Sequence, residues 1–446
     1  MIYLLVREAA GKLRALGMMR VRKKCETQIV YAKAFLLWIF LGCVTGVVLG
    51  VVGSAFHFSI EKAAQLREAY PWLLFLLPAG GFLIALLYHF FLGDDMGTNF
   101  VLIAVRDNRR LRLRKAPLIF VSTVITHLLG GSAGREGAAL QLGGSIASCI
   151  GHKLRLDCQS LRILVVCGMS AAFSAVFGTP LAAAVFAMEV VHVGVMHYSA
   201  IVPALLASLV GFQAASLCGA HPVAFHVTGI PGLTLLSMAQ VTVLGILLAV
   251  LAILFYEGIH TASRLYQKFL PNIILRAAAG GLLVVALTLL VGARDYNGAG
   301  MEMIHSAVGG SARPEAFLLK ILFTALTLGA GFKGGEIVPA FFTGATFGCV
   351  AGPLLGLSPS FSAALGMTAL FCGITNCPIT SLLLSFELFG GEGLPLFALC
   401  IAVSYMLSGH GGLYSEQQMV FSKLKPELYA KDPKICYERE PCHRVP

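Results

Sequence analysis

Long uncharged stretches alternate with short charged ones along the 446-residue chain. Among the stretches without Asp, Glu, Lys or Arg are residues 34–60, 72–93, 163–188, 337–386 and 393–415. Each can hold a membrane-spanning helix, which needs about 20 apolar residues, and the fourth is long enough for two. Gly and Pro recur inside them, as transmembrane helices tolerate better than soluble ones do. The pattern predicts an all-α integral membrane protein with several interrupted helices.

Composition and charge narrow the class of protein further. Hydrophobic residues make up 57% of the chain and charged residues 12%, whereas a soluble domain carries about 25% charged residues. The net charge of +11 could suggest nucleic acid, but basic residues in membrane proteins gather in cytoplasmic loops. Basic clusters occupy Met1 to Lys24 and Arg106 to Lys115. We therefore expect a cytoplasmic basic segment over residues 1–29, a multi-pass protein and no nucleic-acid partner.

Two parts of the chain repeat each other at an offset of 198, since 366 − 168 = 198. The matched positions are Gly168, Met169, Ser170, Ala171, Phe173, Pro180 and Glu189, which return as Gly366, Met367, Thr368, Ala369, Phe371, Pro378 and Glu387. Transporters are often built from repeats of opposite topology, although an old duplication without functional trace would leave the same pattern.

The repeat suggests a division of the chain into five segments. We expect the basic segment 1–29, a first transmembrane repeat over 30–216, a linker over 217–236 and a second repeat over 237–410. Residues 411–446 would form a final pore-lining segment and a short cytoplasmic tail. Because that tail is too short for a folded regulatory domain, we expect a bacterial source and an inner-membrane location.

The stretch Gly130 to Gly137 places Arg135 and Glu136 in a Gly-rich break between apolar segments. An ionisable residue at membrane depth is a functional-site candidate. Glycines allow a sharp turn, and a helix opening at Gly137 would direct its positive end toward an anion. An interfacial Arg–Glu pair on an ordinary loop is the alternative.

A second Gly-rich break spans Gly331 to Pro339 and contains Glu336. Pro339 is suited to the first turn of a helix. If the two breaks face each other, two helix N-termini converge, and their partial charges suit one small, dehydrated anion.

The segments 134–137 (Gly-Arg-Glu-Gly), 334–339 (Gly-Gly-x-x-x-Pro) and 179–182 (Thr-Pro-Leu-Ala) resemble the signatures of CLC anion channels and transporters. The resemblance covers roughly residues 30–425. It implies a CLC-type inverted repeat of tilted and partial helices, and a homodimer with one pore per subunit. It also implies that Glu136 is the gating glutamate, which blocks the anion path when ionised. The implied anion path contains Met96, Gly97, Arg135, Gly137, Ile337, Val338, Phe341, Phe342 and Tyr414.

Departures from the chloride-handling pattern point to the fluoride branch of that family. Met96 stands where chloride-handling members have a serine, and a thioether cannot donate that hydrogen bond. Glu336, the Phe341–Phe342 pair and Ala138 also fit the fluoride branch. Against it, Val338 stands where threonine is expected.

The proton path departs from the chloride exchangers as well. Val190 follows Glu189 where the chloride exchangers have a second acid. The usual inner proton acceptor is thus missing, and Glu336 is our candidate to replace it. Glu189 and its repeat partner Glu387 are interpreted as capping or pairing groups.

The predicted function is export of fluoride in exchange for protons, and hence fluoride resistance. The alternatives are a chloride/proton exchanger or a passive chloride channel of the same fold. An intramembrane enzyme using Glu136, Glu336 and His127 is a third class, but no HExxH or GxSxG signature accompanies them. We expect no cofactor and no metal, because the tail residues Cys436, Cys442 and His443 offer too few ligands.

Overall fold

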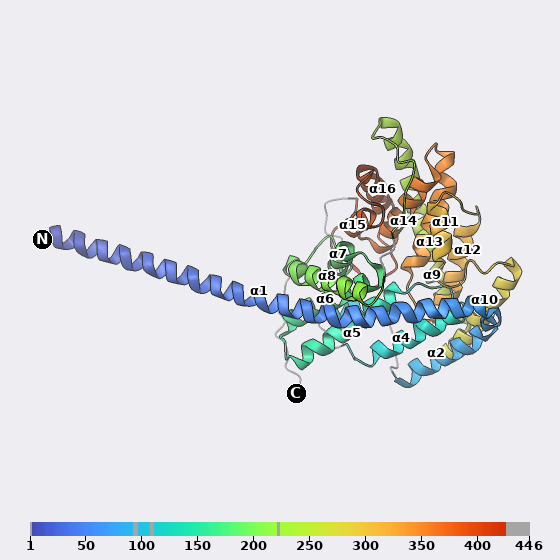
Figure 1. Ribbon diagram of the computed structural model, residues 1–446, viewed down its shortest axis with the longest axis horizontal. Helices are drawn as coiled ribbons and strands as arrows, with labels where there is room; N and C mark the ends of the chain where they lie inside the picture. Colours follow the sequence, from blue (N-terminus) through green and yellow to red (C-terminus); the bar gives the residue numbers. More distant parts are fainter. Residues whose placement is uncertain (1, 92–96, 108–110, 221–223, 425–446) are drawn as a thin grey trace.

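The structure is a computed structural model that describes residues 2–91, 97–107, 111–220 and 224–424. It is almost entirely helical (Figure 1). The first half contains α1 (Ile2–Ala69), η1 (Pro71–Leu76), α2 (Leu77–Phe91), α3 (Thr98–Asp107), α4 (Lys115–Leu128), α5 (Glu136–Lys153), α6 (Cys158–Phe177), α7 (Pro180–Glu189), β1 (His192–Val193), η2 (Tyr198–Ala200) and α8 (Ile201–Leu217). The second half contains α9 (Leu235–Phe269), α10 (Ile273–Val291), α11 (Met301–Val308), α12 (Ala316–Gly329), α13 (Ile337–Leu354), α14 (Pro359–Thr375), α15 (Pro378–Phe389), α16 (Leu394–Leu407) and β2 (Gln418–Met419). Strands β1 and β2 pair in parallel.

Many of these helices are suited to a bilayer. In the described part of the chain, seven are long and apolar enough to cross a membrane, and six further apolar helices are shorter. Bilayer-spanning segments must satisfy their backbone hydrogen bonds internally, which a helix does. The prediction of a multi-pass, all-α membrane protein is confirmed. The uncharged stretch 337–386, long enough for two membrane-spanning helices, holds α13, α14 and most of α15, and of these α13 is among the seven that are long enough to cross.

Each helix of the first half has a counterpart in the second. Helices α4 and α12 have 14 residues each, and α5 and α13 have 18 residues each. The counterparts in this region are 201 residues apart, since 337 − 136 = 201. The offset falls to 198 within the next pair, because α6 has 20 residues and α14 has 17. The sequence repeat with an offset of 198 is therefore the later part of a longer structural repeat.

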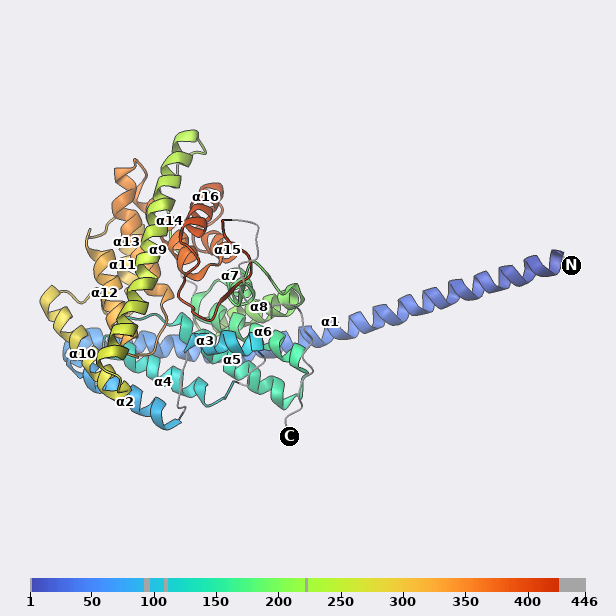
Figure 2. The same ribbon diagram turned by 180° about the vertical axis from the view of Figure 1, so that it is seen from behind.

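Three helices pack directly against their own counterparts. These contacts join α2 to α10, α5 to α13, and α7 to α15. Such contacts are expected where a two-fold relation maps one half onto the other. The two halves also share one continuous hydrophobic core. The repeats are thus interlocked, as expected for an inverted repeat, and Figures 1 and 2 show the helices of both halves packed into one body.

Helix α1 extends far beyond the packed body of the protein (Figure 1). It runs from Ile2 to Ala69 without a break at the expected boundary between residues 29 and 30. Its apolar, membrane-suited part covers Glu26–Ala69. This part contacts α4, α5, α6 and α8, so the helix packs along much of the first half.

Candidate functional site

The two Gly-rich breaks meet and pair through their backbones. Gly134 and Gly335 form an antiparallel bridge in which each amide donates to the other's carbonyl, at 2.6 and 2.7 Å. The approach leaves no room for a side chain: a Cβ on Gly335 would lie 2.7 Å from the Gly137 nitrogen. Glycine is therefore required at the point where the two repeats touch.

Helices α5 and α13 begin directly beside this bridge. Helix α5 begins at Glu136, one residue earlier than predicted, with Arg135 at the N-cap position. Helix α13 begins at Ile337, with Glu336 at the N-cap position. At an offset of 201, Arg135 and Glu336 are structural counterparts with opposite charge. Both helices thus direct their positive N-terminal ends toward one small region.

Glu136 is fully buried at the meeting point of the two helices. Its Oε2 accepts from the backbone N–H of Arg135 at 3.0 Å and from that of Val338, across the repeat, at 3.4 Å. Its Oε1 has no hydrogen-bond partner within the described part of the chain. The carboxyl group therefore occupies backbone donors that could otherwise bind an anion.

Glu336 and Tyr414 lie close to the same meeting point. Among the residues that the structure describes, the Oε2 of Glu336 and the buried hydroxyl of Tyr414 have no hydrogen-bond partner. Glu336 lies within electrostatic range of Glu136, and Tyr414 within range of both acids. Together with Oε1 of Glu136, they make three buried polar atoms without a partner among the described residues. Such a group marks a place for an ion, a proton or water.

The two predicted path phenylalanines have different surroundings. Phe341 belongs to a closed ring of five phenylalanines whose neighbouring centroids are 5.2 to 5.7 Å apart. The other members are Phe173, Phe177, Phe186 and Phe371. Phe342 instead contacts Tyr296 and carries the Lys320 ammonium 5.0 Å from its ring centroid. The two rings do not line one common surface.

The remaining predicted site residues lie around α3 and α13. Gly97 precedes α3, and the next residue, Thr98, donates from Oγ1 to the Gly137 carbonyl at 3.4 Å. Ile337 and Val338 are buried in the first turn of α13. Met96 lies outside the described residues.

Sequence reasoning missed two polar residues next to this site. His57 in α1 accepts a hydrogen bond at Nδ1 from Arg135 Nη1 at 2.7 Å. Lys320 in α12 is fully buried, and its Nζ donates to the carbonyls of Tyr296 at 3.1 Å and Gly298 at 2.8 Å. Lys320 is a lone basic residue inside an apolar helix, and His57 interrupts the uncharged stretch 34–60, so a search for such residues would have found both.

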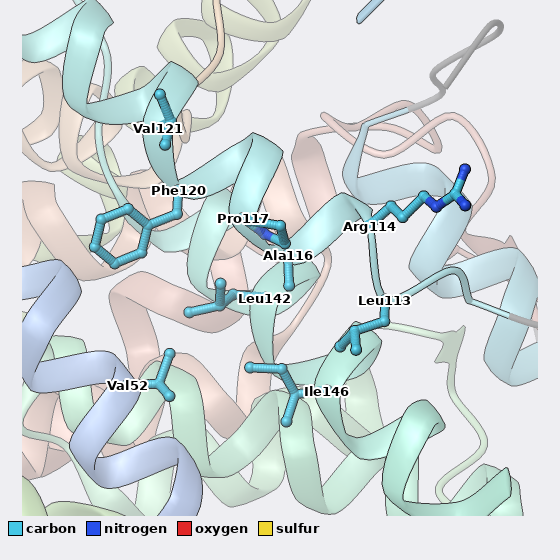
Figure 3. Close-up of a pocket in the computed structure, with 9 residues that line it drawn as sticks. All are labelled: Val52, Leu113, Arg114, Ala116, Pro117, Phe120, Val121, Leu142 and Ile146. Carbon is cyan, nitrogen blue, oxygen red and sulfur yellow. The ribbon is translucent and has the colours of Figure 1, made fainter. Parts of the chain in front are cut away.

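Two hollows lie near the site and differ in character. A polar cavity of about 200 Å³ is lined by Tyr414 together with Tyr256, His260 and Gln417 among others. An apolar groove of about 570 Å³ runs between α1, α4 and α5 (Figure 3). Arg114 stands at one end of the groove and points away from it. Glu136 and Glu336 do not line this groove, which suits lipid chains better than an ion.

The fold and the site together define a membrane transport protein for small anions. Two interlocked repeats bring two helix N-termini and two ionisable side chains to one buried point, as in transporters whose anion sites lie between inverted repeats. The family model "Voltage gated chloride channel" matches residues 80–409. The chain belongs to this family, the CLC anion channels and transporters.

Relatives and solved structures agree with this assignment. The chain is 35% identical to the "Chloride/fluoride channel protein" of Pseudomonas syringae pv. tomato, over 86% of this chain and 87% of that one. It is 26% identical to the "H(+)/Cl(-) exchange transporter ClcA" of Vibrio cholerae, over 78% of this chain and 81% of that one. A crystal structure described as a CLC-type fluoride/proton antiporter superimposes with a TM-score of 0.83 at 32% identity, covering 86% of this chain and 98% of that one. A cyanobacterial Cl−/H+ antiporter has the same fold, with a TM-score of 0.73 at 20% identity over 85% and 96% of the two chains.

Membership of the family settles the class of activity. The family consists of transporters and channels, so the chain is not an enzyme. It is a CLC-type anion/proton transporter with bacterial relatives.

Proposed function

We propose that the chain is a fluoride/proton antiporter that exports fluoride from a bacterial cell. The observation that carries this proposal is the Gly134–Gly335 bridge, which brings the buried acid of one repeat next to the acid at the helix start of the other. Two kinds of similarity support it: the 35% identity to a protein named for chloride and fluoride, and the 32% identity to the fluoride/proton antiporter structure.

The geometry supports exchange at Glu136. Its carboxylate accepts from the backbone N–H groups of Arg135 and Val338, which are donors that an incoming fluoride requires. Fluoride carries a large desolvation cost, so it can bind only where close donors replace its water. Anion and carboxylate thus compete for one set of amides. Protonation removes the charge of the carboxyl group, which leaves the amides to the anion.

The second acid supplies the proton step that Glu189–Val190 cannot. Glu336 has an unpartnered oxygen and lies within electrostatic range of both Glu136 and Tyr414. The polar cavity beside Tyr414 gives protons an approach from water. In this proposal Glu336 is the inner proton acceptor, and Tyr414 with Gly97, Gly137, Ile337 and Phe341 surrounds the anion.

The assembly and orientation are part of the proposal. Each subunit would carry a complete path inside a homodimer, with the N-terminus in the cytoplasm. The basic segment 1–29 would lie outside the membrane, and residues 217–236 would link the repeats 30–216 and 237–410.

A chloride/proton exchanger or a passive chloride channel is the alternative, and the Vibrio cholerae relative, named a proton/chloride exchanger, favours the former. Purified protein in liposomes separates these possibilities. A fluoride gradient imposed at equal pH should drive proton uptake, and an imposed pH gradient should move fluoride against its own gradient.

The same liposomes tested with chloride and without protein provide the controls. Coupled proton movement with chloride but not fluoride would establish the exchanger. Anion flux without proton movement would establish the channel, and either result would reject the proposal.

A further inference from the structure

His57 joins the exposed surface to the residue that precedes the buried acid. It lies in α1 with a side chain that is 16% exposed, and its Nε2 is 3.8 Å from Oε2 of Glu61, which is 52% exposed. On its other side, Nδ1 lies 2.7 Å from Nη1 of Arg135. The chain of contacts therefore runs from the exposed Glu61, through His57, to Arg135.

The contact with Arg135 fixes the protonation state of the imidazole. A guanidinium group has donors only, so Nδ1 of His57 must be the acceptor and carry no proton. The proton of the neutral ring then sits on Nε2, facing Glu61. A second proton on Nδ1 would replace the acceptor by a donor and set two cations against each other.

Arg135 links this histidine to Glu136 in two ways. Its backbone N–H donates to Glu136 Oε2 at 3.0 Å, and its guanidinium lies within electrostatic range of the same carboxyl group. A change in the position of the Arg135 side chain therefore alters the balancing charge at the acid, while the backbone donor stays in place.

The surroundings of His57 provide few other charges. Glu61 comes from its own helix and Arg135 from the start of α5. From α4, His127 lies within electrostatic range of Arg135, and its Nδ1 is paired with the Thr123 carbonyl at 2.8 Å. Near this turn, α6 and α8 meet glycines of α1 with small uncharged residues.

We propose that His57 is a positioning residue for exchange: its neutral imidazole fixes Arg135 beside Glu136, and its protonation releases Arg135 and slows transport. This inference rests on the proposed function, since it assigns a pH-sensitive control to the same site. In the proposed orientation, the Ala69 end of α1 faces away from the cytoplasm. External acid then reaches His57 through Glu61.

The test compares three variants with wild type in oriented liposomes. Fluoride-driven proton transport is measured while the pH inside and the pH outside the liposomes are varied separately. His57→Gln keeps an acceptor for Arg135 but cannot titrate. His57→Leu removes the acceptor. His152→Gln is the matched control, because His152 lies at the far end of α5 with its Nδ1 on the Ser148 carbonyl at 2.7 Å.

Wild type and His152→Gln should slow only when the bath on the Glu61 side is acidified well below the ordinary histidine midpoint of about pH 6.5, because burial and the adjacent Arg135 cation oppose a second proton on the ring. His57→Gln should transport near the wild-type rate at neutral pH and should not slow in this way on acidification. His57→Leu should be about tenfold to a hundredfold slower at every pH, the cost of leaving a charged donor without its acceptor. An unchanged pH step in His57→Gln, or a wild-type neutral rate in His57→Leu, would overturn the proposal.

A measurement independent of transport separates this inference from the proposed function. Nitrogen-15 spectra of histidine-labelled protein in bilayers, assigned with His57→Gln, should show His57 as the neutral ring with its proton on Nε2 at pH 7. The Arg135→Gln variant should lose that tautomer preference. If wild type does not couple fluoride to protons, the function has failed, and these spectra still decide the His57–Arg135 contact. A doubly protonated or Nδ1–H ring in wild type would reject it.

Discussion

Glu189 and Glu387 each cap the helix that carries the other. Glu189, the last residue of α7, accepts from the backbone N–H groups of Ile379 and Thr380 at the start of α15, at 3.1 and 2.8 Å. Glu387 in α15 accepts from Leu181 and Ala182 at the start of α7, both at 2.8 Å. The interpretation of these acids as capping groups is confirmed. These reciprocal caps hold the two repeats together.

Removal of either cap should destabilise the fold. Glu189→Ala and Glu387→Ala should each lower the free energy of unfolding by about 1.5 to 3 kcal/mol, since buried amides lose a charged acceptor. Thermal unfolding in detergent, with the exposed Glu392→Ala as control, measures the effect. Melting temperatures equal to the control would mean that the caps contribute nothing.

Lys320 should be required to hold the loop before α11. Lys320→Met keeps the length of the side chain but leaves the carbonyls of Tyr296 and Gly298 without their donor. We expect a loss of about 1 to 3 kcal/mol in unfolding free energy, whereas the exposed Lys268→Met should change it by less than about 0.5 kcal/mol. Equal stability of both variants would show that the ammonium group is dispensable.

Glu136→Gln should abolish fluoride-driven proton transport. The amide cannot release or accept the proton, so proton uptake by liposomes should fall to the level of protein-free vesicles. Fluoride movement should then either stop or become a passive leak. Because the native carboxyl accepts two hydrogen bonds from the described residues, size-exclusion chromatography should still give the same folded assembly as wild type. Native proton flux in this variant contradicts the exchange mechanism.

Glu336→Gln should slow or uncouple proton movement while leaving Glu136 in place. The reason is that position 190 holds Val instead of a second acid, and that Glu336 lies within electrostatic range of both Glu136 and Tyr414. Simultaneous fluoride-electrode and pH recordings give the ratio of the two fluxes, and Glu392→Gln is the control. A native ratio at the native rate would place the inner proton acceptor elsewhere.

Met96→Ser should raise chloride flux relative to fluoride flux. The serine hydroxyl restores a donor that a thioether lacks, and one additional hydrogen bond corresponds to a change of about 0.5 to 1.5 kcal/mol, or two- to tenfold in the ratio. Matched liposome assays with each anion measure it. An unchanged ratio argues against a role for Met96 in selectivity.

The sequence was informative where the signal is local. Glycines adjacent to paired charges mark both breaks, and proline marks helix starts; Pro359 and Pro378, each the first residue of its helix, would also have revealed the third helix within 337–386. Contacts between segments that are far apart in the sequence could not be predicted from such local signals. Nothing near His57 in the sequence indicates Arg135, which lies 78 residues away. The different surroundings of Phe341 and Phe342 likewise depend on packing, because adjacent residues on a helix face different directions.

The bridge between Gly134 and Gly335 also bears on how such a protein could arise. Because each break pairs with its own counterpart, a half-length ancestor carrying one break could have built the same junction by associating with a second copy of itself. Gene fusion would then have preserved an existing site rather than created one. Once the two copies were separate in sequence, their N-cap positions could diverge, one to arginine and one to glutamate, which makes the two sides of the junction chemically unlike.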